Sequence, residues 1–64
     1  MQTPIIDKVV QFGSVIANVV RNANGVELGR LHFSQGFWYA LRNGKVVAIR
    51  EDEVTAARDL EVLL

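Results

Sequence analysis

The dipeptide Asn43-Gly44 lies between two apolar runs, and it constrains the fold of this chain more than any other feature. A type I′ turn needs positive φ at both central residues, which Gly adopts freely and Asn tolerates. The sequence therefore predicts a tight hairpin that joins residues 37–42 to residues 45–50. In an unbroken register, Trp38 lies opposite Ile49.

A third strand is predicted over residues 26–33. The following Ser34-Gln35-Gly36 segment suits a three-residue hairpin loop, with Gly36 in the left-handed conformation. This loop length puts Phe33 opposite Phe37 and His32 opposite Trp38. The three segments then form an antiparallel meander.

Residues 5–20 are interpreted as a helix, because their polar side chains gather on one arc of a helical wheel. Val and Ile are frequent in this segment, and both favour strands. A hairpin of residues 8–12 with residues 15–21 is therefore the competing interpretation. The helix is preferred because neither half of such a hairpin alternates cleanly between polar and apolar residues.

A second helix is predicted after Arg50. It begins with Glu51-Asp52-Glu53, whose charges suit the positive end of the helix dipole. The apolar side of this helix consists of Val54, Ala57, Leu60, Leu63 and Leu64. The expected fold is one α+β domain over residues 1–64 with the order α-β-β-β-α. Both helices pack on one face of the three-stranded antiparallel meander, and Gly29 leaves room for a helix to approach.

The predicted register gives the sheet two different faces. The core face would collect Leu31, Phe33, Phe37, Tyr39, Leu41, Val46 and Ala48. The opposite face mixes cations with large apolar side chains, and Trp and Arg are the residues most enriched at binding hot spots. The expected partner-binding residues on that face are Arg30, His32, Trp38, Arg42, Lys45, Val47 and Ile49.

The apolar arc of the predicted helix over residues 5–20 is wider than a helix needs to rest on a sheet. Either the second helix or another copy of the chain must cover the excess. Apolar residues recur there at spacings of four and three, as in a seam between helices. The expected self-association residues are Ile5, Val9, Phe12, Ile16 and Val19.

Residues that could support catalysis are scarce. The chain contains no cysteine and one histidine, His32, beside which the predicted register places no carboxylate. Glu51, Asp52 and Glu53 are consecutive, so they fan out around a helix start and do not converge on a metal ion. We therefore expect no enzymatic activity, no metal and no cofactor. The apolar stretch from residue 5 to residue 20 is interrupted by charges, so we expect no membrane association.

The order helix, three strands, helix resembles the double-stranded-RNA-binding domain. That family presents lysines at the start of its last helix, whereas this chain has Glu51-Asp52-Glu53 there. Residues 26–63 also resemble the AP2-like arm-binding domains of phage integrases, which lay a sheet in a DNA groove. That resemblance implies DNA contacts by Arg30, Trp38, Arg42 and Lys45.

Seven basic and seven acidic residues give zero formal net charge, which argues against whole-molecule attraction to nucleic acid. We expect a non-enzymatic protein–protein interaction module that forms a homodimer in the cytoplasm and binds a protein partner. A small accessory or inhibitor protein of a phage or plasmid would have this size. Nucleic-acid binding through the exposed basic and aromatic sheet face is the second hypothesis.

Overall fold

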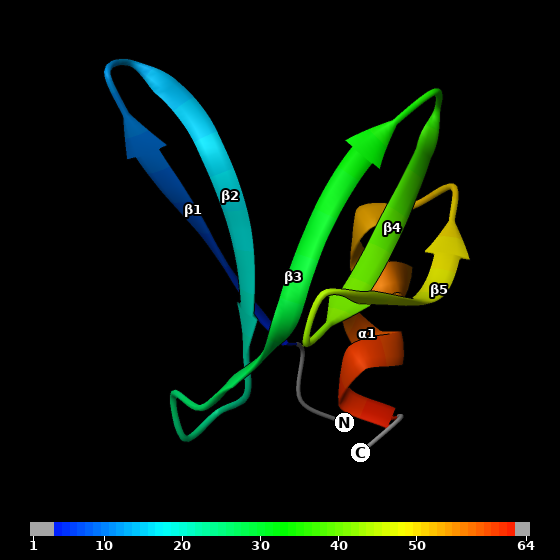
Figure 1. The fold of residues 1–64 in the computed structure, drawn as a ribbon. Helices are drawn as coiled ribbons and strands as arrows, with labels where there is room; N and C mark the ends of the chain where they lie inside the picture. The colour runs from blue at the N-terminus through cyan, green and yellow to red at the C-terminus, as the bar shows by residue number, and fades with distance from the viewer. Residues whose placement is uncertain (1–3, 63–64) are drawn as a thin grey trace.

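The computed structural model describes residues 4–62, which form a five-stranded antiparallel sheet and one helix (Figure 1). The strands pair in chain order, β1-β2-β3-β4-β5. The elements are β1 (Ile5–Gln11), β2 (Ser14–Arg21), β3 (Glu27–Ser34), β4 (Phe37–Arg42), β5 (Lys45–Arg50) and α1 (Glu53–Val62). The expectation of a three-stranded meander with two helices is therefore wrong.

The difference lies in residues 5–20, where the predicted helix is replaced by the β1–β2 hairpin. The competing hairpin interpretation was correct in kind, although its turn falls one residue earlier than expected. Gln11 pairs with Ser14, so Phe12 and Gly13 form the turn. Frequent Val and Ile, together with Gly13 at φ +78°, outweigh the helical spacing of the polar residues.

The same two-residue turn occurs in three of the four hairpin connections of the sheet, and β2–β3 has a longer loop. In each of the three, two residues with positive φ connect the strands, as in a type I′ turn. The φ angles are 52° and 78° at Phe12 and Gly13, 54° and 85° at Gln35 and Gly36, and 54° and 78° at Asn43 and Gly44. The turn predicted at Asn43-Gly44 is confirmed. The three-residue loop predicted after Phe33 is wrong, because Ser34 pairs directly with Phe37.

This shorter loop shifts the pairing of β3 with β4 by one residue and so reverses the face on which each β4 side chain lies. Phe33 pairs with Trp38 instead of Phe37, and the centroids of the two rings lie 5.0 Å apart. Leu31 pairs with Ala40, which is fully buried. The predicted core face was therefore right for β3 and wrong for β4.

A β-bulge changes the register again between β4 and β5. Leu41 pairs with Val46 as predicted, but Ala40 then pairs with Ala48, so Val47 is the extra residue. The bulge places the small Ala48 beside the buried core.

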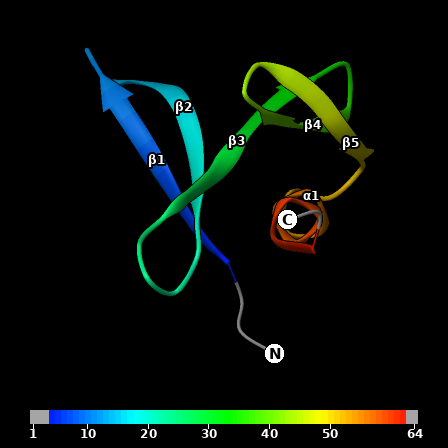
Figure 2. The same ribbon diagram turned by 60° about the horizontal axis from the view of Figure 1, so that its bottom comes forward.

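The helix α1 contacts β3, β4 and β5, and Figure 2 shows it lying beneath that half of the sheet. Its buried residues are Ala56, Ala57 and Leu60. A Cβ atom added to Gly29 would lie 2.4 Å from the carbonyl oxygen of Leu41 and 2.9 Å from Leu60 Cδ2. The expectation that Gly29 admits the helix is confirmed, because a larger residue would meet both β4 and α1.

Side chains stabilise both ends of α1. Asp52 Oδ2 accepts hydrogen bonds from the backbone N–H and the hydroxyl of Thr55, at 2.9 Å each, which makes Asp52 the N-cap. The hydrogen bond from the Thr55 backbone is the largest cause of the lowered pKa of Asp52. At the other end, the Arg42 guanidinium donates to the carbonyl oxygens of Leu60 and Leu28.

The predicted apolar side of α1 is only partly confirmed. Ala57 and Leu60 are buried, but Val54 is exposed, and Ala56 takes its place in the core. Leu63 and Leu64 lie outside the described residues. Over the described part of the chain, α1 lacks the length and apolar character that a membrane-spanning helix requires.

Candidate interaction site: the fork between β2 and β3

The strands β2 and β3 pair only near their shared loop and then separate. Their pairing runs from Arg21 with Glu27 to Asn18 with Leu31. Beyond it, residues 14–17 of β2 and residues 32–34 of β3 have no partner on the sides that face each other. We call this opening the fork, and Figure 1 shows its two arms diverging.

Side-chain hydrogen bonds stabilise the closed end of the fork. The Arg21 guanidinium donates to Asp7 Oδ2 at 2.9 Å and to the Gly25 carbonyl at 3.2 Å. Asn22 closes the β2–β3 loop by accepting the backbone N–H groups of Asn24 and Val26 on its side-chain oxygen. The base of the hairpin is therefore joined firmly to the rest of the sheet.

The free half of the β1–β2 hairpin is apolar and uncovered. Two residues at its base, Val19 and Val20, belong to the buried core. Beyond that base the hairpin exposes Val9, Val10, Phe12, Val15 and Ile16, and Ile5 is exposed at the base itself, where it pairs with Arg21. Phe12, at the tip, is 98% exposed. Contiguous exposed apolar side chains of this kind mark interaction sites in soluble proteins.

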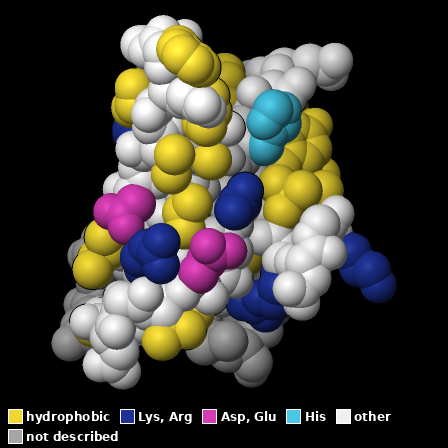
Figure 3. Space-filling view, turned by 60° about the vertical axis from the view of Figure 1, so that its left-hand side comes forward, with side chains coloured by type: hydrophobic (Ala, Val, Ile, Leu, Met, Phe, Trp, Pro, Cys, Tyr) yellow, Lys and Arg dark blue, Asp and Glu magenta, His cyan; other side chains and the backbone are white. Residues whose placement is uncertain are grey.

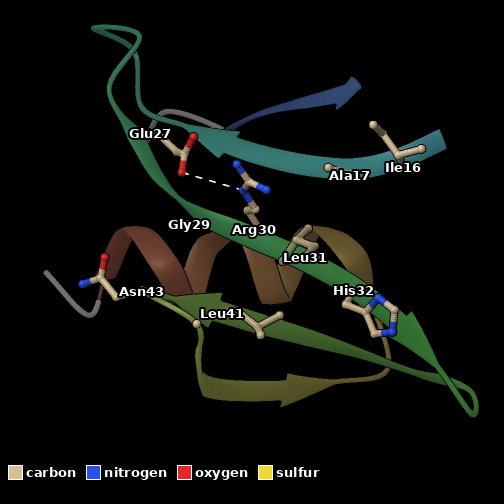
Figure 4. A pocket seen from close by; sticks show the side chains of 10 residues that line it. Ile16, Ala17, Glu27, Gly29, Arg30, Leu31, His32, Leu41 and Asn43 are labelled. Atoms are coloured by element: carbon tan, nitrogen blue, oxygen red, sulfur yellow. Dashed lines mark ion pairs between the residues drawn. The ribbon is translucent and has the colours of Figure 1, made fainter. Parts of the chain in front are cut away.

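A groove of about 470 Å³ lies at the fork, on the side of the sheet opposite α1 (Figure 4). Ile16 and Ala17 of β2 line one wall. Arg30 and His32 of β3, with Leu41 of β4, line the other. This volume lies within the ~300–1,000 Å³ range of pockets that hold small ligands or side chains.

Charges of both signs border the groove. Arg30 Nε lies 3.9 Å from Glu27 Oε2, and this pair is exposed. With the hairpin side of the molecule forward, Figure 3 shows acidic and basic side chains next to one another across the middle. Hydrophobic side chains lie above them and beside the histidine. The β2 wall of the groove is thus apolar, whereas its other side carries Glu27, Arg30 and His32, with Asn43 from the β4–β5 turn.

The structure separates the seven predicted partner-binding residues. The register places Arg30, His32 and Ile49 together on the face opposite α1. It places Trp38, Arg42 and Lys45 on the side of α1, and Val47 in the bulge. The single cationic face is a wrong prediction, because each shift of register by one residue reverses a strand's sidedness. His32, predicted to lie opposite Trp38, pairs with Tyr39 instead, and the ring of Trp38 contacts that of Phe33.

The structure exposes four of the five predicted self-association residues and buries the fifth. Ile5, Val9, Phe12 and Ile16 are exposed, but they lie on a hairpin and form no helical seam. Val19 is 4% exposed and belongs to the core. The helical spacing of these five residues therefore reflected no helix.

Sequence reasoning missed Val10, Val15 and Ala17, which share the free half of the hairpin or its groove. Recognising Phe12-Gly13 as a turn would have revealed them, since Gly occupies the second position of all three two-residue turns. It also missed the role of Arg42 at the end of α1, because no local signal connects residues so distant in sequence.

Residues 4–62 contain no cluster of three or more His, Asp or Glu side chains that could hold a metal ion. Comparison with protein-family models, curated proteins and solved structures gave no match to this chain. The argument about function therefore rests on the geometry of the fork and of the hairpin beside it.

Proposed function

We propose that this chain is a non-enzymatic protein–protein interaction module that associates with itself through the free half of the β1–β2 hairpin. One observation carries the proposal: six large apolar side chains are exposed on this hairpin, while α1 covers the other half of the sheet. The six are Ile5, Val9, Val10, Phe12, Val15 and Ile16.

The energetics of a short chain support this proposal. A domain of 64 residues buries a smaller fraction of its surface on folding than a larger domain does, and a two-stranded ribbon without a second layer is marginally stable in water. A second copy would supply the missing layer. Burial of apolar surface contributes roughly 25 cal/mol per Å², so covering the hairpin would favour the dimer substantially.

The nucleic-acid hypothesis has less support. It needed Arg30, Trp38, Arg42 and Lys45 on one exposed face, but the register leaves only Arg30 on the face opposite α1. Arg30 also lies near Glu27, and Arg42 is engaged with backbone carbonyls around α1. A phosphate-binding surface needs several cations that point the same way.

Sedimentation velocity over a dilution series tests the proposal. We expect a concentration-dependent dimer of the wild-type chain. The double variant Val10→Thr/Val15→Thr keeps β-branched side chains but makes them polar, so it should raise the dimer dissociation constant by about tenfold or more. Val46→Thr is the matched control, because Val46 is 51% exposed and Val15 is 54% exposed, but Val46 lies outside the hairpin.

A wild-type chain that stays monomeric at every concentration would overturn the proposal. Equal weakening by Val46→Thr and by the double variant would also contradict it, because the interface would then not be specific to the hairpin.

A further inference from the structure

Phe12 occupies a backbone conformation that does not suit it. Its φ is +52°, in the left-handed region, where a bulky residue is a genuine outlier. The side chain is 98% exposed, so no packing within the chain compensates for the conformational cost. Residues held in such conformations without structural benefit cluster at functional sites.

The other two turns show what this position ordinarily holds. At the equivalent position, with φ 54° in both cases, the chain has Gln35 and Asn43. Asn is among the residues best suited to the first central position of a type I′ turn. A chain selected for folding alone would not place Phe at the tip of its most exposed hairpin. Phe12 therefore has the properties of an aromatic anchor for a binding partner.

The groove at the fork has the chemistry to receive a phenyl ring. Its apolar wall presents Ile16 and Ala17, and Leu41 lies across from them. Arg30 lies on the same side as Leu41, where its guanidinium can stack on an aromatic face. The volume of about 470 Å³ is ample for one ring. Phe12 of the same copy does not fill this space, since it is almost fully exposed.

The occupant that fits is the Phe12 of a second copy. Each copy carries both the anchor and the groove, so a two-fold axis lets two copies exchange anchors and close the assembly. The inner edge of β2 that leads into the groove, residues 14–17, carries no charge. The outer edge, β1, has Asp7 and Lys8 at its middle, which oppose self-pairing there. Two copies therefore approach more favourably through the fork than through β1.

We propose that Phe12 of one copy inserts into the groove of a second copy, between Ile16 and Ala17 on one wall and Arg30 and Leu41 on the other, and that the exchange is reciprocal. This inference rests on the proposed self-association. It adds the anchor, the groove that receives it and the symmetry of the dimer.

The substitution Phe12→Asn separates folding from association. It relieves the conformational cost at the turn, so the melting temperature of the monomer should rise when measured below the dimer dissociation constant. It also removes the anchor, so the dimer dissociation constant should rise by roughly thirtyfold, as for loss of a hot-spot aromatic. Gln35→Asn is the matched control: it should also raise the melting temperature but leave dimerisation unchanged. If Phe12→Asn dimerises as tightly as the wild type, the proposed anchor is wrong.

Photocrosslinking locates the groove directly. The photoreactive residue p-benzoylphenylalanine replaces Phe12, and ¹⁵N-labelled chains are mixed with unlabelled ones so that mass spectrometry identifies links between copies. We expect links between chains at Ile16, Ala17, Arg30 or Leu41. Links between chains at β1 or α1 would overturn the inference, as would links confined to one chain.

The two proposals fail in different ways. A wild-type chain that is monomeric at all concentrations overturns both of them. A dimer that Val10→Thr/Val15→Thr weakens but Phe12→Asn does not would retain the hairpin interface and reject the exchange of Phe12.

Discussion

The two halves of the sheet contain the same kinds of turn and strand, but they differ in whether a helix covers them. Both contain hairpins with two-residue turns and β-branched strands, yet only β3, β4 and β5 are covered by α1. In the covered half, the small side chains of Ala40 and Ala48 and the larger ones of Leu31 and Trp38 pack into the core that α1 completes. In the β1–β2 hairpin, large apolar side chains are exposed. Turn and strand signals thus define hairpins, but a second layer decides whether a hairpin belongs to the core.

The largest expected difference between the halves concerns Leu60, which is 0% exposed. Leu60→Ala should lower the free energy of unfolding by about 2–5 kcal/mol, because it opens a cavity under β3 and β4. Val15→Ala in the free half of the hairpin should change the stability of the monomer by no more than about 0.5 kcal/mol. Urea denaturation at low protein concentration measures both. Similar losses from the two variants would mean that the hairpin is covered within the monomer.

Overpacking gives the next largest contrast. Gly29→Ala places a Cβ against the Leu41 carbonyl and Leu60, so we expect a loss of about 1–3 kcal/mol or more. Ala17→Val adds carbon atoms to the open half, where no second layer crowds them. It should be nearly neutral for the monomer in the same denaturation assay. A stable Gly29→Ala variant would show that both β4 and α1 can shift to admit the Cβ.

Replacing Arg42 should destabilise the fold more than replacing Arg30, which borders the fork. Arg42→Gln removes the hydrogen bonds to the Leu28 and Leu60 carbonyls, which should cost about 1.5–3 kcal/mol. Arg30→Gln loses only an exposed ion pair with Glu27, worth about 0–1 kcal/mol. Thermal unfolding below the dimer dissociation constant compares them. Equal effects would contradict the role of Arg42 at the end of α1.

The smallest expected effect is a pH dependence of stability, which comes from Asp52 in the covered half. Because folding lowers the pKa of Asp52, its charge stabilises the fold above the unfolded pKa of about 3.9. That contribution is lost as the pH falls through the lower, folded pKa. Asp52→Asn keeps a good N-cap without the charge, so its melting temperature should fall less steeply than that of the wild type below about pH 5. Parallel curves for the two proteins would show that the Asp52 charge does not stabilise α1.

Local sequence signals predicted part of this arrangement well. Asn43-Gly44 gave its turn, the residues after Arg50 gave a helix with Asp52 near its start, and Gly29 indicated a close approach of that helix. Each depends on the chemistry of a few neighbouring residues. The exposed apolar residues Ile5 and Phe12 were also identified, although on the wrong secondary structure.

Long-range sidedness could not be obtained in this way. A loop one residue shorter than predicted before Phe37 reversed the faces assigned to Trp38 and Lys45, and one bulge residue, Val47, changed the register again for the rest of β5. Errors of this kind propagate along a strand because side chains alternate with a period of two. The fork depends on still more distant relations, since its groove joins side chains of β2, β3 and β4.

The sequence by itself determined the turns and the strand-forming character of most segments, because φ preferences and β-branching act over a few residues. Only the tertiary structure decided which faces α1 covers, where β2 separates from β3, and that Phe12 stands exposed at the tip of an uncovered hairpin. The physical reason is that coverage depends on packing between segments far apart in the chain. The one helix of residues 4–62 covers one half of the sheet and leaves the other half open.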